Sequence, residues 1–169
     1  MPLPIINIAD LTTQPMPEGM GPTGDACQKY GAQMAFIGPV LGAKKLGYNL
    51  TEVEPGKSAF PYHCHRVNEE MFYILEGEGR LRLGENHQPI KAGDIIACPP
   101  GGPETAHQII NTGANVLRFL AVSTRLTPEL AEYPDSGKFG VMAQYSDADG
   151  KPEMFLHVGK REQNLPYWD

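Results

Sequence analysis

The chain has 169 residues and a formal net charge of −6, and it contains 19 glycines and 16 prolines. A chain of this length fits one domain with a sizeable core, and its glycine and proline content favours short strands and turns over helices. The acidic balance argues against nucleic acid or an anionic membrane surface as a partner, and no apolar run is long enough to span a bilayer.

The N-terminus and the cysteines bear on where the protein resides. Residues 1–10 lack the basic and apolar regions of a secretory signal. Cys27, Cys64 and Cys98 form an odd set without a disulfide-like framework. We therefore expect a cytoplasmic protein, because the cytoplasm keeps thiols reduced.

The N-terminal part of the chain is predicted to be an arm followed by a first strand. Residues 1–34 are rich in proline and glycine, which rules out a long helix and favours an extended segment. Residues 35–46 show a weak strand pattern that glycines interrupt. The stretch Leu46–Glu54 then alternates and ends at the turn Pro55-Gly56, so it predicts a strand.

Two histidines begin the most informative stretch. His63 and His65 are two residues apart, and in a strand this spacing puts both imidazoles on one face. Glu70 then begins an apolar run that ends at Glu76 and predicts the following strand.

The predicted strand at Glu70–Glu76 is apolar on both faces. One face carries Phe72 and Ile74, and the other carries Met71, Tyr73 and Leu75. If Glu70 shares the inner face with a metal, the outer residues must be covered by the N-terminal arm or by a second subunit. We therefore predict a homodimer.

Five more short strands are predicted downstream. They are Arg80–Leu83, Gln88–Lys91, Asp94–Cys98, Thr105–Ile110 and Val116–Ser123. Short strands at this regular spacing are typical of a sandwich or a barrel. Strands do not alternate with helices, which argues against a parallel doubly wound sheet, and the absence of an internal repeat favours one barrel rather than two.

The C-terminal part gives weaker signals. Residues 128–133 are compatible with one or two helical turns, and the remainder through Asp169 is expected to be loop-rich. Tyr167 and Trp168 are expected to pack on the barrel or on a partner, because a lone tryptophan is usually buried. We therefore expect an N-terminal arm (1–34), a barrel (35–126) and a C-terminal extension on the barrel (127–169).

A third histidine, His107, follows a turn rich in glycine and proline. Together with His63, His65 and Glu70 it would provide three nitrogens and one carboxylate oxygen, which suit zinc, iron, nickel, copper or manganese. The alternative is that these histidines are satisfied core or rim residues, but the number and type of ligands favour a metal. Glu69 is a second candidate for the carboxylate, and it would face the opposite side of the strand.

At this point the pattern resembles the cupin superfamily. The first cupin motif is matched by Gly56, His63, His65, Glu70 and Gly77, with six residues instead of five between Gly56 and His63. The second motif is matched by Gly93, Pro99, Gly101, His107 and Asn111, with a longer gap before His107. The six-residue interval from Glu70 to Gly77 selects Glu70 over Glu69, and the resemblance covers roughly residues 47–124.

The resemblance implies an all-β double-stranded β-helix, or jelly-roll barrel, that holds one divalent transition metal such as zinc, iron, nickel or manganese. It implies little about the reaction, because the superfamily includes dioxygenases, isomerases, decarboxylases, lyases, sugar-binding modules and storage proteins. The chain looks most like small bacterial cupins described as sugar phosphate isomerase-like.

Three functional hypotheses follow. The first is a metal-dependent enzyme, an isomerase or a dioxygenase, that binds a small sugar-like or carboxylate substrate at an open metal position. The second is a non-catalytic module for the same kind of small molecule, and the third is a structural or storage role without metal. An isomerase needs a group that transfers protons near the metal, whereas a binding module does not. The sequence names no such catalytic base. Asp135 and Lys138 belong to a polar loop that could fold over the barrel mouth, although an ordinary turn is the favoured explanation of that loop.

Overall fold

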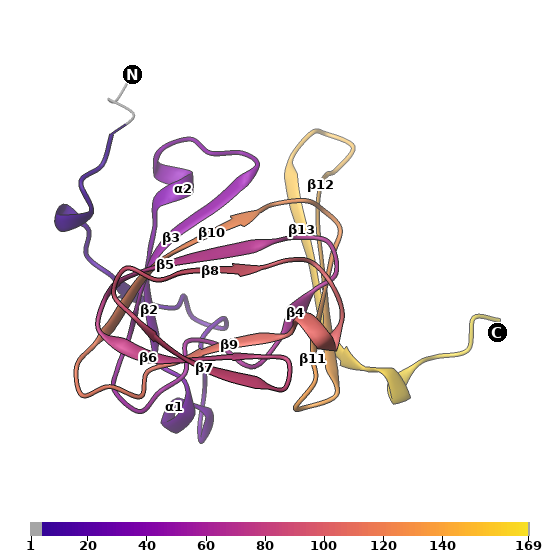
Figure 1. Cartoon of the computed structure of the whole chain (residues 1–169). Coiled ribbons are helices and arrows are strands. Elements are labelled where there is room, and N and C mark those ends of the chain that lie inside the picture. The colour runs from indigo at the N-terminus through magenta and orange to yellow at the C-terminus, as the bar shows by residue number, and fades with distance from the viewer. Residues whose placement is uncertain (1–4, 169) are drawn as a thin grey trace.

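The computed structural model describes residues 5–168, and these residues form antiparallel sheets with few helices. Residues 1–4 of the predicted arm and Asp169 of the predicted extension lie outside this range. Figure 1 shows two sheets facing each other and a third sheet at one end of them. This arrangement confirms the prediction of an all-β jelly-roll fold.

The largest sheet has six strands in the order β1-β2-β3-β10-β5-β8. Its strands are β1 (Gln14–Pro15), β2 (Ala32–Phe36), β3 (Leu46–Val53), β10 (Leu117–Thr124), β5 (Glu70–Glu76) and β8 (Ile95–Cys98). The second sheet has the order β7-β6-β9. It consists of β7 (Asn86–Lys91), β6 (Glu78–Leu83) and β9 (His107–Ile110). The strands predicted between residues 46 and 124 are therefore present, and β5 has the predicted bounds.

The core lies between these two sheets. It includes Val53, Phe72, Ile74, Leu81, Ile90, Ile96, Ile109, Leu117 and Phe119, all of them buried. These side chains come from alternate positions of strands in both sheets, as the period of a half-buried strand requires. Apolar alternation is therefore what holds the two sheets together.

The turn after β5 requires glycine. Gly77 has a φ of 83°, and a Cβ at this position would lie 2.6 Å from the carbonyl oxygen of Val116 and 3.0 Å from the Cα of Leu117. Both the backbone conformation and the close approach of a neighbouring strand therefore exclude a side chain here. This turn sends the chain from the first sheet into the second.

The outer face of β5 is open, as its alternation predicts. Met71 and Tyr73 are 47% and 43% exposed, and Ile95 on the paired strand β8 is 69% exposed. The arm from residue 5 onward does not cover these residues, because β1 pairs with β2 at the other edge of the six-stranded sheet. The sequence analysis expected either the arm or a second subunit to cover this face. For the described part of the arm that expectation was wrong.

The N-terminal segment contains more regular structure than predicted. It includes the 3-10 turn η1 (Ile8–Asp10) and the short helix α1 (Ala26–Lys29), and β2 begins at Ala32, before the expected start of the barrel. The weak strand predicted at 35–46 ends at Phe36, and the one-turn helix α2 (Ile37–Val40) follows it.

The C-terminal segment forms a third sheet, which the sequence did not predict. Its order is β13-β12-β11-β4. The strands are β13 (Pro152–Lys160), β12 (Lys138–Ser146), β11 (Glu129–Tyr133) and β4 (Cys64–His65). Residues 128–133, which were compatible with helical turns, are therefore mostly strand, because pairing with β4 and β12 imposes the extended conformation on β11. The expectation of a loop-rich remainder was wrong, because β12 and β13 form a hairpin there. The remaining 3-10 turns are η2 (Pro103–Thr105) and η3 (Arg161–Gln163).

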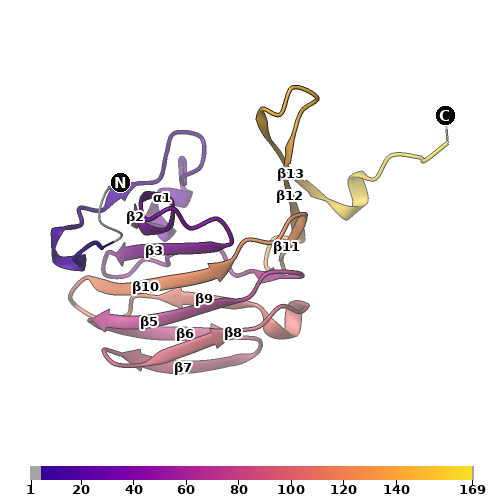
Figure 2. The same ribbon diagram turned by 90° about the horizontal axis from the view of Figure 1, so that it is seen from above.

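The last described residues do not pack on the barrel. In Figure 2 the β12–β13 hairpin projects away from the two facing sheets, and the C-terminal end extends beyond it. Tyr167 and Trp168 lie against each other with ring centroids 4.7 Å apart, and they are 88% and 82% exposed. Packing on the barrel, one of the two expected alternatives, is therefore wrong, and packing on a partner stays a prediction. Within residues 5–168, no helix has both the length and the apolar character to cross a membrane.

Candidate metal centre

The backbone brings the two histidine motifs together. His63 and His107 form an antiparallel bridge in which the His107 N–H donates to the His63 carbonyl at 2.8 Å and the His63 N–H donates to the His107 carbonyl at 3.2 Å. His65 follows two residues later on β4, and Glu70 begins β5. Four side chains that are up to 44 positions apart in the sequence therefore meet at one end of the facing sheets.

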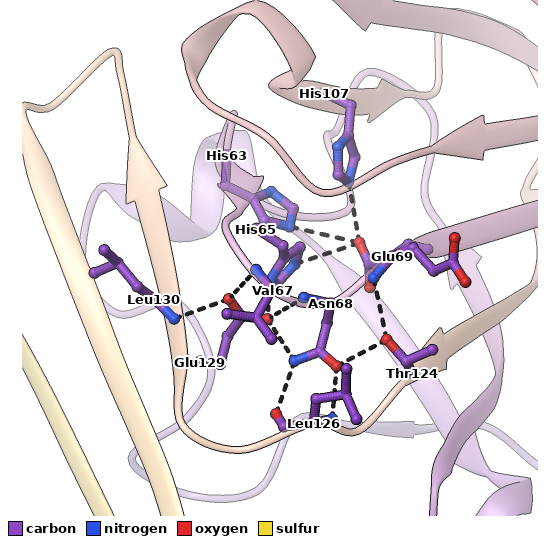
Figure 3. Close-up of polar contacts among 11 residues, drawn as sticks. His63, His65, Val67, Asn68, Glu69, His107, Thr124, Leu126, Glu129 and Leu130 are labelled. Atoms are coloured by element: carbon purple, nitrogen blue, oxygen red, sulfur yellow. Dashed lines mark hydrogen bonds and ion pairs between the residues drawn. The ribbon is translucent and has the colours of Figure 1, made fainter.

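The three imidazoles converge on one carboxylate oxygen. The Nε2 atoms of His107, His65 and His63 lie 3.0, 3.5 and 3.8 Å from Glu70 Oε2. Figure 3 shows the three rings turned toward the same point. Such convergence of imidazole nitrogens and a carboxylate oxygen matches a ligand set for a transition metal.

The four residues are not equivalent in geometry. The ligand atoms of His63, Glu70 and His107 all lie within 4.8 Å of one another, and His65 falls outside this group. His65 nevertheless contacts the same Glu70 oxygen as the other two histidines. The structure thus forms a close group of three, with His65 beside it.

The protonation of His63 suits metal binding. Its pKa is lowered from 6.5 to about 4: burial is the largest cause, the neighbouring His107 acts in the same direction, and the attraction of Glu70 opposes both. His63 Nδ1 lies 2.7 Å from the carbonyl oxygen of Pro61, which can only accept, so Nδ1 carries the proton. The lone pair of Nε2 is then free on the side of Glu70.

Glu70 is held in its charged form. Burial raises the pKa of this carboxyl, but the hydrogen bonds with His107 and His65 and the nearby imidazoles outweigh burial and hold the pKa below its usual range. A carboxylate beside a neutral imidazole is the protonation pattern that a bound metal ion requires. The residues present therefore fit a divalent transition metal.

A second carboxylate, Glu129, lies behind His65, and the sequence analysis missed it. Its Oε2 is 3.5 Å from His65 Nδ1, which makes no other close polar contact among the described residues. Burial opposes protonation of His65, but Glu70 and Glu129 together raise its pKa. Carboxylates behind metal-binding imidazoles commonly orient the ring. No signal pointed to Glu129, because its segment was assigned no definite structure and its pairing with β4 is not visible in the local sequence.

Backbone donors hold Glu129 in place. Its carboxylate accepts N–H groups from Val67 at 3.1 Å, Asn68 at 2.8 Å and Leu130 at 2.8 Å. The Asn68 side chain also contacts Glu129, and it accepts hydrogen bonds from the Thr124 hydroxyl and the Leu126 N–H (Figure 3). The loop between the two ligand strands is therefore tied to the ends of β10 and β11.

The alternative carboxylate, Glu69, lies outside the centre. Its side chain is exposed, and its N–H donates to the Thr124 hydroxyl at 3.1 Å. Glu70, the next residue, points inward to the histidines. This difference follows from the alternation of side chains along a strand.

Cavities give access to the centre from two sides. One cavity of about 290 Å³ is lined by all four residues of the centre and otherwise mostly by apolar side chains. A second cavity of about 320 Å³ touches His65, Glu70 and Glu129, and its lining includes Arg125. A small molecule can therefore reach the point where the imidazoles converge.

The other candidates from the sequence do not join the centre. Cys64 packs in a separate buried cluster, and burial raises the pKa of Cys98 to about 12, so both cysteines are inert, packed residues. Asp135 pairs with Arg82, with oxygen–nitrogen distances of 2.7 and 3.0 Å. Lys138 lines a neighbouring cavity of about 530 Å³ that none of the four central residues touches.

The comparisons with known proteins concern this part of the chain. A family model described as a cupin domain matches residues 49–123, which include all three histidines and Glu70. A solved structure from Silicibacter pomeroyi, described as a sugar phosphate isomerase from a cupin superfamily, has a TM-score of 0.76 and 25% identity, and the match covers 97% of this chain and 98% of that one.

Two curated relatives match parts of the chain. The oxalate-binding protein of Thermotoga maritima is 41% identical over 68 residues, which are 40% of this chain and 54% of that protein. Auxin-binding protein 1 of Arabidopsis thaliana is 34% identical over 114 residues, which cover 62% of this chain and 55% of that protein. The chain therefore spans about half the length of these curated relatives.

Proposed function

Because this chain belongs to the cupin superfamily, we propose that it holds one divalent transition metal and binds a small oxygen-donor molecule on it. The proposed ligands are His63, His65, Glu70 and His107. The observation that carries this proposal is the position of three imidazole Nε2 atoms within 3.8 Å of one Glu70 oxygen. Four protein ligands leave positions free on an octahedral metal, and a bound metal supplies Lewis acidity there.

The lining of the 290 Å³ cavity favours binding over isomerisation. Apart from the four proposed ligands, none of its described lining residues is titratable. A further acid, Glu129, contacts His65, but its carboxylate already accepts three backbone N–H groups. Isomerisation needs a group that shuttles a proton, so a metal-dependent binding protein for a small carboxylate is the better proposal. The oxalate-binding name of the Thermotoga relative agrees with it.

An isomerase is the second candidate. It is supported by the match over nearly the whole chain to the structure described as a sugar phosphate isomerase. It is also supported by the position of His65, which lies outside the group of three and between Glu70 and Glu129. In this candidate His65 moves a proton instead of binding the metal.

Elemental analysis of protein purified without chelator or affinity metal tests the proposal. We expect about one equivalent of zinc, iron, nickel or manganese per chain. Calorimetric titration with oxalate and a sugar phosphate then tests ligand binding, and an isomerase assay tests the second candidate. Protein that stays metal-free after incubation with each of these ions would contradict the proposal.

We also propose a homodimer that uses the outer face of β5 and β8. Met71, Tyr73 and Ile95 form an exposed apolar patch there, and such patches on a folded protein favour association.

A further inference from the structure

The cavity at the proposed metal centre has apolar walls. Its lining includes Met16, Met20, Met34, Phe60, Phe72 and Phe119. Met16 and Met20 come from the N-terminal arm, and the others belong to the facing sheets or the loop before β4. Methionine and phenylalanine side chains offer adaptable and aromatic contacts to an apolar ligand.

The polar groups of this cavity are concentrated at the proposed ligands. Beyond the four residues of the centre, its described lining contains two carboxamides, Asn49 and Gln108, and no lysine or arginine. Gln108 already donates its Nε2 proton to the carbonyl oxygen of Phe60 at 2.8 Å. A phosphate group on a ligand in this space would lose its hydration without gaining a hydrogen bond from a lysine or arginine. A second carboxylate on the ligand would have the same disadvantage.

We infer that the ligand of this cavity is a small monocarboxylate with an apolar body about the size of a phenyl ring. This inference rests on the proposed function and narrows its class of ligand. The carboxylate lies at the metal beside the imidazoles, and the apolar body contacts the methionines and phenylalanines. A cavity of about 290 Å³ is at the small end of protein ligand sites, which suits one ring and a short head group.

Positive charge is found in the adjoining cavities instead. Arg125 lines the 320 Å³ cavity, where its Nη2 contacts Gln144 Oε1 at 3.4 Å, and Lys138 lines the 530 Å³ cavity. Arg125 lines the same cavity as His65 and Glu70, two residues of the centre. A sugar phosphate would therefore have to use Arg125 and the other cavity.

Calorimetric titration of the metal-loaded protein, after its metal content has been measured, tests the inference. Phenylacetate, oxalate and fructose 6-phosphate serve as probes. We expect phenylacetate to bind at least about tenfold more tightly than the other two, because the apolar body gains contacts that they cannot make. Tighter binding of oxalate or fructose 6-phosphate overturns the inference and leaves the metal proposal intact. A protein that takes up no metal overturns both.

Three variants locate the ligand. Ala121 lines the cavity, whereas Ala97 on β8 is exposed and absent from its lining. Ala121→Leu should weaken phenylacetate binding about tenfold with unchanged metal content, and Ala97→Leu should leave the affinity unchanged. Equal affinity in Ala121→Leu and wild type overturns the inference. Arg125→Ala should also leave phenylacetate binding unchanged, and a loss of binding in this variant would move the ligand to the other cavity.

Discussion

His65 lies between two carboxylates: its Nε2 is 3.5 Å from Glu70 Oε2, and its Nδ1 is 3.5 Å from Glu129 Oε2. The two acids come from different strands, β5 and β11, and Glu129 is fixed by three backbone N–H groups. The orientation of the ring is therefore set by a part of the chain beyond the segment that the cupin family model matches.

Glu129→Gln should lower metal affinity by about 10–100-fold, because the amide removes the charge behind His65. Glu132→Gln is the matched control. Glu132 lies on the same strand but contacts Arg66 and Arg161, at 3.0 and 2.7 Å. Competition with a colorimetric chelator measures both affinities. Equal losses of metal affinity in the two variants would indicate a general effect on β11. They would contradict the role of Glu129 in orienting the His65 ring.

His65→Ala should abolish stoichiometric metal binding and leave the fold intact, since His65 is only partly buried. His87→Ala is the control, because His87 is exposed on β7. Elemental analysis and circular dichroism give the two readouts. Full metal occupancy in His65→Ala, together with a loss of isomerase activity, would favour the second candidate function and make His65 a proton-transfer group.

Gly77→Ala should destabilise the fold much more than Gly93→Ala. Both glycines have positive φ, 83° and 94°, but only at Gly77 does a Cβ meet neighbouring backbone, 2.6 Å from the Val116 oxygen. Gly93→Ala should cost about 1–2 kcal/mol from the backbone conformation alone, and Gly77→Ala about 3 kcal/mol or more. Denaturant unfolding measures the free energy of unfolding of both variants. Equal losses would mean that the backbone at Val116 moves away from residue 77 at little cost.

The stability of the protein should fall above pH 9 because of Cys98. Burial, with a smaller effect of Glu70, raises the pKa of this thiol from 9.0 to about 12. The folded state therefore keeps a proton that the unfolded state loses, so stability is complete below pH 9 and decreases as the pH rises toward 12. The slope is at most about 1.4 kcal/mol per pH unit. Urea unfolding between pH 8 and 10.5 should show a weaker decrease in Cys98→Ser than in wild type, and identical slopes would contradict the assignment.

Tyr73→Glu should convert a dimer into a monomer in sedimentation velocity at micromolar concentration, because it places a charge in the exposed patch on β5. Tyr145→Glu is the control, since Tyr145 is 53% exposed on the projecting hairpin. A wild-type monomer would defeat the dimer proposal. Dissociation by Tyr145→Glu alone would move the interface to the hairpin.

Local patterns were sufficient to predict much of this fold. The alternation of Phe72 and Ile74 with Met71 and Tyr73 gave both the bounds of β5 and its buried face. The spacing of His63 and His65 and the position of Glu70 predicted residues that the structure brings together. These features depend on neighbours within a few positions, which a sequence displays directly.

The errors concern contacts between distant parts of the chain. β11 is extended because Ala131 and Glu132 pair with His65 and Cys64, more than 60 positions earlier, and residues 128–133 alone do not reveal this pairing. Glu129 was missed for the same reason. Trp168 does not pack on the barrel, one of its two expected sites, because the hairpin before it leads away from the core.

The pairing of β4 with β11 also affects the order in which the protein matures. On the ribosome, His63, His65, Glu70 and His107 emerge before Glu129 and its strand. Until then β4 lacks its partner in the third sheet, and His65 lacks the acid behind it. At the proposed site, an ion that binds before β11 docks would meet a His65 ring without Glu129 behind it, whereas one that binds later would meet a ring that Glu129 contacts. Strands β5 to β10 lie between β4 and β11 in the sequence, so the proposed metal site gains its support from Glu129 only after most of the chain has been synthesised.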